Sequence, residues 1–175
     1  MKDFENYEFV VKQKNEGSYR LKKILFILLY VSVAIGLFAG GVGLRILAPC
    51  IAIVPLLLWI LIFFTWRFAN VEHECIFESG VMICSEIYGN RTRRVLFKTV
   101  IRDMLLIAPE TEAYIAEAEK HGVEKVYKMT SSKNASGVYF AIFKDEGGKT
   151  AAVYFEANEK VLKILQFYNR SAVKK

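Results

Sequence analysis

The chain has 175 residues, of which 54% are hydrophobic and 24% charged, and its formal net charge is +6. Average soluble domains are about 45–50% apolar with about a quarter of their residues charged, so the apolar excess must be concentrated somewhere in the chain. Between Lys23 and Arg67 the only charged residue is Arg45. This distribution excludes a single soluble globule and a disordered chain. Three cysteines are too few for a disulfide scaffold.

Two uncharged segments, residues 24–44 and 46–66, contain 21 residues each. At a rise of about 1.5 Å per residue, a helix of that length reaches about 31 Å, which matches the hydrocarbon core of a bilayer. The sequence therefore predicts a transmembrane helical hairpin over residues 24–66. A cleaved signal peptide is the alternative interpretation of the first segment, although its apolar stretch is longer than usual and begins late in the chain.

Basic residues indicate how this hairpin is oriented. Several flank its outer ends, whereas Arg45 alone lies in the turn between the two segments. Loops rich in lysine and arginine stay in the cytoplasm, so both an N-terminal segment (residues 1–23) and a domain over residues 67–175 are expected there. The prediction is a multi-pass protein of the cell membrane with both termini cytoplasmic. The flanking basic residues are Arg20, Lys22, Lys23 and Arg67.

Two prolines mark the second segment. Pro49 is expected at its start, where the missing backbone N–H costs least, and Pro55 lies deeper and is expected to kink the helix. Trp59 is expected in the middle of the span. Trp66 suits an anchor at the cytoplasmic interface.

Small residues recur every four positions, at Ser32, Gly36 and Gly40 in the first segment and at Ala48 and Ala52 in the second. This spacing allows helix backbones to approach closely in lipid. Two interpretations stay open, namely packing within the hairpin and a homodimer through Gly36 and Gly40. No ionisable residue lies inside either segment, so a transporter or channel is not expected.

After residue 67 the apolar runs give way to alternation, which is typical of strands. Ser79-Gly80, Gly89-Asn90 and the segment DEGGK are turn signals of β-hairpins. Seven strands are predicted, followed by a helix that Asn158 caps, with a helical insert at residues 111–121 after the fourth strand. The predicted strands cover residues 70–78, 81–88, 91–97, 103–108, 123–129, 138–144 and 150–156.

This order of elements resembles pleckstrin-homology-like (PH-like) domains, in which two near-orthogonal antiparallel sheets form a partly open barrel closed by a C-terminal helix. The whole chain is similar to bacterial two-span membrane proteins that carry a cytoplasmic PH-like domain. The expected fold class is therefore a membrane α-helical hairpin plus an α+β, mainly β soluble domain. The resemblance rests on element order, and it implies a scaffold that binds lipid or protein rather than an enzyme.

Two cysteines and their neighbours are a candidate chemical site. If Ser79-Gly80 is a two-residue turn, Cys75 pairs with Cys84 and His73 with Glu86 on the inner face of the sheet. Core thiols, a metal site and a redox pair are the open interpretations. Core thiols are favoured, because the spacing matches no structural zinc pattern and the cytoplasm opposes a stable disulfide. The same alternation places on this face Val71, Phe77, Met82, Tyr88, Val95 and Phe97.

Other chemistry finds little support in the sequence. No nucleophile elbow, Walker A motif or paired carboxylates occur, so no catalytic residue, metal or cofactor is predicted and the protein is not expected to be an enzyme. Residues 67–175 hold 17 basic and 14 acidic residues, a net charge of +3. They show no basic stripe with interleaved aromatics, so nucleic acid is not an expected partner.

The basic run that begins at Arg91 is the most informative feature. The first strand leaves the membrane after Arg67 and the second must return, so the Gly89-Asn90 turn is expected near Asn70. Each lysine or arginine near an anionic leaflet contributes about 1 kcal/mol, which favours contact with anionic lipids. The alternatives are a solvated hairpin in which Arg93 pairs with Glu86, and arginines that only enforce topology. The predicted juxtamembrane belt consists of Arg20, Lys22, Lys23, Arg67, Arg91, Arg93 and Arg94.

The functional expectation is a non-enzymatic membrane protein that presents a PH-like interaction domain as an adaptor or assembly subunit to an unidentified protein partner. The polar loop 130–137 and the insert 111–121 are the candidate contact surfaces. The alternative is a sensor of anionic lipid head groups that acts through the arginine belt. For residues 1–23, an interfacial amphipathic helix and a strand added to the β domain through YEFVV are both open.

Overall fold

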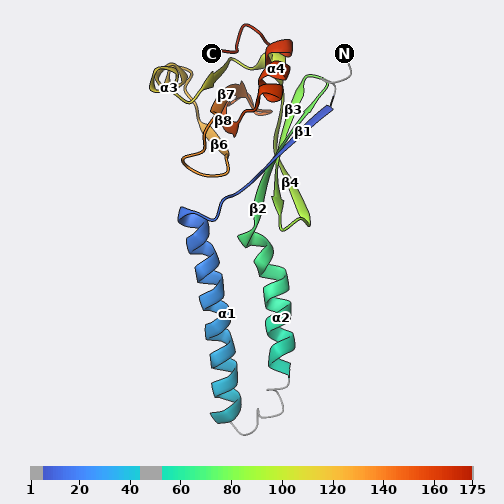
Figure 1. Ribbon diagram of the computed structural model, residues 1–175, viewed down its shortest axis with the longest axis vertical. Helices are drawn as coiled ribbons and strands as arrows, with labels where there is room; N and C mark the ends of the chain where they lie inside the picture. The colour runs from blue at the N-terminus through green and yellow to red at the C-terminus, as the bar shows by residue number, and fades with distance from the viewer. Residues whose placement is uncertain (1–5, 44–52, 175) are drawn as a thin grey trace. The chain divides into compact units, whose positions relative to one another are not determined.

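The computed structural model describes residues 6–43 and 53–174, which form eight strands, four α-helices and two short 3-10 helices (Figure 1). They divide into two compact units. The β unit consists of the described residues up to Gln13, Glu72–Ile87 and the chain from Arg93 onward, and the helical unit consists of Lys14–Val71 and Tyr88–Thr92. In chain order the elements are β1 (Asn6–Lys12), α1 (Gly17–Gly43), α2 (Val54–Thr65), η3 (Trp66–Ala69), β2 (Val71–Glu78), β3 (Val81–Tyr88), β4 (Thr92–Val100), η4 (Ile101–Asp103), β5 (Leu106–Pro109), α3 (Glu112–Glu119), β6 (Lys125–Met129), β7 (Val138–Lys144), β8 (Thr150–Glu156) and α4 (Glu159–Tyr168).

The first sheet has the strand order β1-β2-β3-β4 and includes the N-terminal segment. β1 pairs antiparallel with β2 in a register that runs from Asn6 opposite Glu78 to Lys12 opposite Glu72. Of the two interpretations of this segment, the added strand is the one observed. Among the described residues the two sheets therefore contain eight strands, one more than the seven expected. The two helices are inserted between the first two strands of one sheet.

Two tight turns set the β2–β3 and β3–β4 hairpins. Ser79 and Gly80 have φ values of 49° and 82°, and both Gly89 and Asn90 have a φ of 57°. Positive φ at both central residues is typical of type I′ turns, whose twist matches that of the flanking strands. The backbone N–H of Arg91 donates to the Tyr88 carbonyl at 3.2 Å, which closes the second turn over two residues, as predicted.

The second sheet has the order β5-β7-β8-β6 and differs in one respect from the expected antiparallel arrangement. β7 pairs antiparallel with both β5 and β8, but β6 pairs parallel with β8, from Lys125 opposite Ala151 to Met129 opposite Phe155. The loop 130–137 is long enough to carry the chain from β6 past the position of β8 to β7. A tight hairpin would have forced β6 and β7 to be neighbours.

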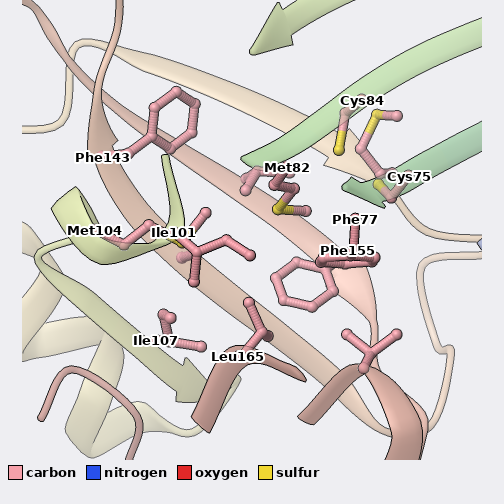
Figure 2. Packing of buried hydrophobic residues seen from close by; sticks show 14 of the residues in the cluster. Cys75, Phe77, Met82, Cys84, Ile101, Met104, Ile107, Phe143, Phe155 and Leu165 are labelled. Atoms are coloured by element: carbon pink, nitrogen blue, oxygen red, sulfur yellow. The ribbon is translucent and has the colours of Figure 1, made fainter. Parts of the chain in front are cut away.

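The main core lies in the β unit and draws side chains from both sheets and from α4 (Figure 2). Asn158 caps α4 as predicted, because its side-chain oxygen accepts from the Val161 backbone N–H at 2.8 Å. Val161 and Leu165 are fully buried on the inner face of this helix. Fully buried core residues besides these include Phe77, Met82, Cys84, Ile101, Met129, Phe143 and Phe155.

One expected core position is exposed. The side chain of Val95 is 58% exposed, although alternation placed it on the inner face with Phe97, which is buried. β4 is the edge strand of its sheet, and only its second half, from Leu96 onward, contacts the core. Alternation predicts which side chains share a face, but it does not predict where the covering sheet ends.

In the helical unit α1 packs beside α2. The Tyr30 hydroxyl lies 2.6 Å from the Thr65 hydroxyl, and the rings of Tyr30 and Trp66 are 6.4 Å apart. Among the described residues one helix, over Tyr19–Gly40, is long and apolar enough to cross a membrane, while the apolar helix Val54–Ala69 is shorter.

The second predicted span is therefore only partly described. Pro55 lies in the first turn of α2, where its missing N–H requires no partner, rather than inside a kinked helix. The predicted turn at Arg45, Pro49 and the pair Ala48 and Ala52 lie outside the described residues.

Candidate functional site

The turn between β3 and β4 is packed against the end of η3. The Gly89 backbone N–H donates to the Asn70 carbonyl at 2.8 Å, so the turn lies beside Asn70 as predicted. A Cβ atom at Gly89 would lie 2.9 Å from both the Cα and the Cβ of Arg67. Glycine is required here twice over, for its positive φ and for this close approach.

Two arginines of this turn region lie over aromatic rings. The guanidinium of Arg91 lies 4.0 Å from the centroid of the Phe63 ring on α2, and that of Arg67 lies 4.8 Å from the Phe68 ring. A cation over a ring face is stabilised by the quadrupole of the ring, while the guanidinium edges keep their N–H donors for other partners. The Nε atom of Arg67 is buried and has no hydrogen-bond partner among the described residues.

These side chains surround a hollow of about 250 Å³ within the helical unit. Both tryptophans of the chain line it, and the rings of Trp59 and Phe63 are 5.4 Å apart. Its described lining includes two cations and no acidic side chain, so an anionic group of a ligand suits it electrostatically. The described lining residues are Trp59, Ile62, Phe63, Trp66, Arg67, Asn70, Gly89 and Arg91.

The structure brings together part of the predicted belt. Arg67 and Arg91 share the hollow, whereas Arg93 donates from Nη2 to Glu74 Oε1 at 2.6 Å in the β unit. This contact is an ion pair, and Glu74 is a partner of Arg93 that the sequence analysis did not name. Arg94 is exposed on β4. The remaining members, Arg20, Lys22 and Lys23, lie in the first two turns of α1 and do not line the hollow.

Glu74 is a site residue that the sequence did not reveal. Its carboxylate is fully buried, and Oε2 has no hydrogen-bond partner among the described residues. Burial raises the pKa of Glu74, and the neighbouring carboxyl of Glu8 raises it further, while Arg93 lowers it. Alternation had placed Glu74 on the solvent face of β2, and nothing in the pattern signals that neighbouring side chains cover it.

The two thiols lie together in the core, as the predicted strand pairing requires. Cys75 and Cys84 are both free and buried, and burial raises the pKa of the Cys84 thiol well above its usual range, with Cys75 adding to the effect. Burial also lowers the pKa of His73, which Glu86 partly opposes. In the described part of the chain no three histidine, cysteine or acidic side chains form a group that could hold a metal ion.

The chain matches the model of one protein family over nearly its whole length. A family model described as Bacterial PH-like domain (DUF6106) matches residues 5–175. The chain belongs to this family. The match includes β1 and both inserted helices, so the helical insertion is part of what the family model covers. Neither a curated protein nor a solved structure matches the chain.

Membership in this PH-like family supports an interaction-domain role, and the two expected contact surfaces are partly occupied inside the fold. α3 packs against the second sheet through Tyr114 and Ala118, which belong to a cluster with Phe140. In the loop 130–137, the backbone N–H of Ser131 donates to Glu156 Oε1 at 2.6 Å, and Ser131 is buried. Only the outer sides of these segments are free for a partner.

Proposed function

We propose that this PH-like protein is integral to the cell membrane as a helical hairpin, and that it presents its sheet domain to the cytoplasm as a non-enzymatic adaptor or assembly subunit. The first span is α1, and the second is the segment that ends in α2 and η3. Both termini are cytoplasmic in this proposal, because the basic residues flank the outer ends of the insertion.

The pairing of β1 with β2 is the observation that carries the proposal. β1 precedes the helical insertion and β2 follows it, yet they are adjacent strands of one sheet over seven residue pairs. Strands that are hydrogen-bonded in one sheet lie on the same side of a membrane. If α1 crosses the bilayer, the chain between Gly43 and Val71 must cross back, and the apolar helix Val54–Ala69 is the described segment available for it.

The exposure of the helices supports the same proposal. Leu28, Ile35 and Phe38 on α1 and Trp59 on α2 are each at least 59% exposed. A helix with apolar residues on all faces is buried in a protein or in lipid, because water does not tolerate so large an apolar surface. No described part of the chain covers these side chains, so a bilayer is the environment that suits them.

Extraction of membranes tests this proposal directly. Membranes from cells that express the full chain are washed with alkaline carbonate and then with detergent. The expected result is a protein that carbonate leaves in the pellet and detergent releases. A matched control replaces residues 13–71 by Asn-Gly, which joins Lys12 to Glu72 through a two-residue hairpin, and this chain is expected in the soluble fraction. Release of the full chain by carbonate would contradict the proposal.

A second function, contact with anionic lipid head groups, is favoured by the hollow beside α2. Arg67 and Arg91 line it together with two tryptophans, and aromatic residues of this kind are enriched at the membrane interface. Each arginine near an anionic leaflet contributes about 1 kcal/mol. In this proposal a lipid phosphate accepts hydrogen bonds from the guanidinium edges, while the rings hold the two guanidinium groups in place.

Tryptophan fluorescence reports on this second function, because both tryptophans of the chain line the hollow. The full chain is reconstituted in phosphatidylcholine nanodiscs with increasing phosphatidylglycerol. We expect a saturable change in emission that high salt weakens. The double variant Arg67→Gln, Arg91→Gln should need about tenfold more anionic lipid for the same change, whereas Arg102→Gln, Lys133→Gln should match the parent. If the emission does not change with the phosphatidylglycerol content, the lipid proposal is wrong and the adaptor proposal stands alone.

A homodimer through Gly36 and Gly40 is part of the proposal as well. A Cβ atom added at either glycine would meet nothing within 4 Å in the described structure, so this face of α1 is not used to pack against α2. Of the two interpretations of the small residues, the described structure leaves the face free for a second copy.

A further inference from the structure

Two edge strands of the β unit border a groove that neither the membrane anchor nor the lipid contact uses. β4 ends the first sheet and β6 ends the second, so each has a hydrogen-bonded neighbour on one side only among the described strands. Residues of both strands line a groove of about 340 Å³. An edge strand presents a row of unpaired N–H and C=O groups, which is a template for a further strand.

The floor of this groove consists of aromatic rings that contact one another. The rings of Phe97 on β4 and Tyr127 on β6 are 4.8 Å apart, and Phe97 stacks on Phe143 at 4.6 Å. On β4, Val95 also lines the groove, and its side chain is 58% exposed. Apolar side chains that alternate along an extended segment would find partners on this floor and at Val95.

The charges on the two strands have one sign. β4 and β6 carry basic residues and no acidic residue. Arg93 is engaged with Glu74, but Arg94, Lys98, Lys125 and Lys128 are all exposed. Two acidic residues of the β7–β8 loop, Asp145 and Glu146, also line the groove. Asp145 is held in its loop, since Oδ1 accepts from the backbone N–H groups of Gly147 and Lys149 at 2.9 Å each, so the acidic residues of the groove belong to this loop and the exposed cations to the two edge strands.

We propose that the groove between β4 and β6 binds an extended, acidic segment of a partner protein by adding it as a strand to a free sheet edge. Backbone hydrogen bonds to the edge would supply sequence-independent affinity, and carboxylates opposite Lys98 and Lys125 would supply selectivity. The proposal rests on the interaction role of the PH-like domain and names the partner chemistry. The basic residues used here are separate from Arg67 and Arg91.

The test uses the full chain in nanodiscs of phosphatidylcholine alone, so that anionic lipid cannot compete. The probes are three fluorescent octapeptides with blocked ends, namely alternating glutamate and valine, alternating lysine and valine, and the glutamate peptide with alternate backbone nitrogens methylated. Binding is measured by anisotropy, and hydrogen exchange maps the amides that become protected. The test variant is Lys98→Glu, Lys125→Glu, and the matched control is Lys163→Glu, Lys174→Glu at two exposed positions outside the groove.

We expect the glutamate peptide to bind and to protect amides of β4 or β6. The test variant should bind it at least about tenfold more weakly, and the control variant should bind it as the parent does. The lysine peptide and the methylated peptide should not bind. Equal binding of the acidic and basic peptides, an unchanged test variant, protection away from β4 and β6, or no binding would each overturn the proposal. These results are independent of carbonate extraction, so failure here is distinguishable from failure of the membrane proposal.

Discussion

The β unit and the helical unit use the same apolar residue types in opposite ways. In the β unit, Phe140, Phe143 and Ile142 are fully buried. In the helical unit, Phe38, Leu28 and Ile35 are 59–63% exposed, and none of the described residues of α2 is buried. Apolar surface is removed from water in the first case by other side chains, and in our proposal by lipid in the second.

In our proposal one chain has a β unit with a protein core and an insertion with lipid-facing helices, and the insertion begins and ends at the pair of strands β1 and β2. The register of β1 with β2 lets the helices leave the sheet after Lys12 and return at Glu72. The sheet then holds both ends of the insertion at one place, whatever the environment of the helices. Stability of the β unit should therefore depend on its own core and little on outward-facing side chains of α1.

The largest expected effect is a difference in unfolding free energy between one substitution in the β unit and one in the helical unit. Phe143→Ala removes a fully buried ring that stacks on Phe97, and such changes cost about 3–5 kcal/mol of unfolding free energy. Phe38→Ala, at an exposed position of α1, should change the unfolding of the β unit by less than about 0.5 kcal/mol. Urea unfolding of the full chain in detergent measures both. Equal losses of unfolding free energy in the two variants would show that the exposed side chains of α1 stabilise the β unit as much as its own core does.

A smaller effect is expected at the turn that packs against η3. In Gly89→Ala the alanine must adopt a positive φ, and its Cβ atom lies 2.9 Å from Arg67. We expect a loss of about 2 kcal/mol or more of unfolding free energy. Gly122→Ala has a similar φ of 64°, but no described atom beyond its chain neighbours lies within 4 Å of the new Cβ, so it should lose only about 1 kcal/mol. Thermal unfolding compares the two variants. If they lose the same amount, the close approach to Arg67 is not a constraint.

A third prediction concerns the pH dependence of the core. Burial lowers the pKa of His73, so the unfolded chain binds a proton more readily, and stability should fall as the pH drops below the usual range of a histidine. His73→Leu should remove this part of the loss and should cost little at neutral pH, because neither ring nitrogen has a partner among the described residues.

The control for this prediction is His121→Leu, at an exposed position, which should leave the pH profile unchanged. The raised pKa of Glu74 acts with the opposite sign, because a protonated Glu74 favours the folded state as the pH falls. That contribution is common to the parent and both histidine variants. Urea titrations at several pH values measure the profiles, and a steeper acid loss in His73→Leu would contradict the assignment.

The smallest effect on the isolated chain is expected at the glycine face of α1. Gly36→Ile, Gly40→Ile should leave unfolding of the monomer nearly unchanged, because no described residue beyond the adjacent helix backbone lies within 4 Å of a Cβ at either position. The same change should abolish a dimer that uses this face. Native mass measurement in detergent compares the parent, this variant and a matched Ile24→Leu, Ile27→Leu control. A dimer that survives the glycine substitutions would exclude the proposed contact.

Much of the fold could be predicted because its signals are local. The pairs Ser79-Gly80 and Gly89-Asn90 predict their hairpins since few other residues adopt positive φ, and Asn158 predicts the start of α4. The position of the Gly89 turn beside Asn70 followed from strand direction alone. The parallel pairing of β6 could not be predicted, because a long loop leaves the order of strands open. The helix and strand alternatives for YEFVV were likewise undecided until the pairing with β2 was observed.

The candidate site was predictable to a lesser degree. Arg67 and Arg91 were expected together, since topology places both near the end of α2. The partner of Arg93 was not, because alternation places Glu74 on the face of its strand opposite Cys75 and Phe77, and burial by neighbouring side chains has no sequence signal. Nothing in the sequence placed Trp59 in this hollow, which it lines with Arg91.

Cysteine labelling in cells measures on which side of the membrane each end of the helical insertion lies. In a Cys50→Ala background, where Cys75 and Cys84 are buried, single cysteines are placed at Glu16, Arg45 and Lys133 and treated with a membrane-impermeant maleimide. We expect the maleimide to label Arg45→Cys alone in intact cells and all three variants in lysed cells. Labelling of Glu16→Cys or Lys133→Cys in intact cells, or protection of Arg45→Cys there, would contradict a helical hairpin inserted between β1 and β2 with both ends in the cytoplasm.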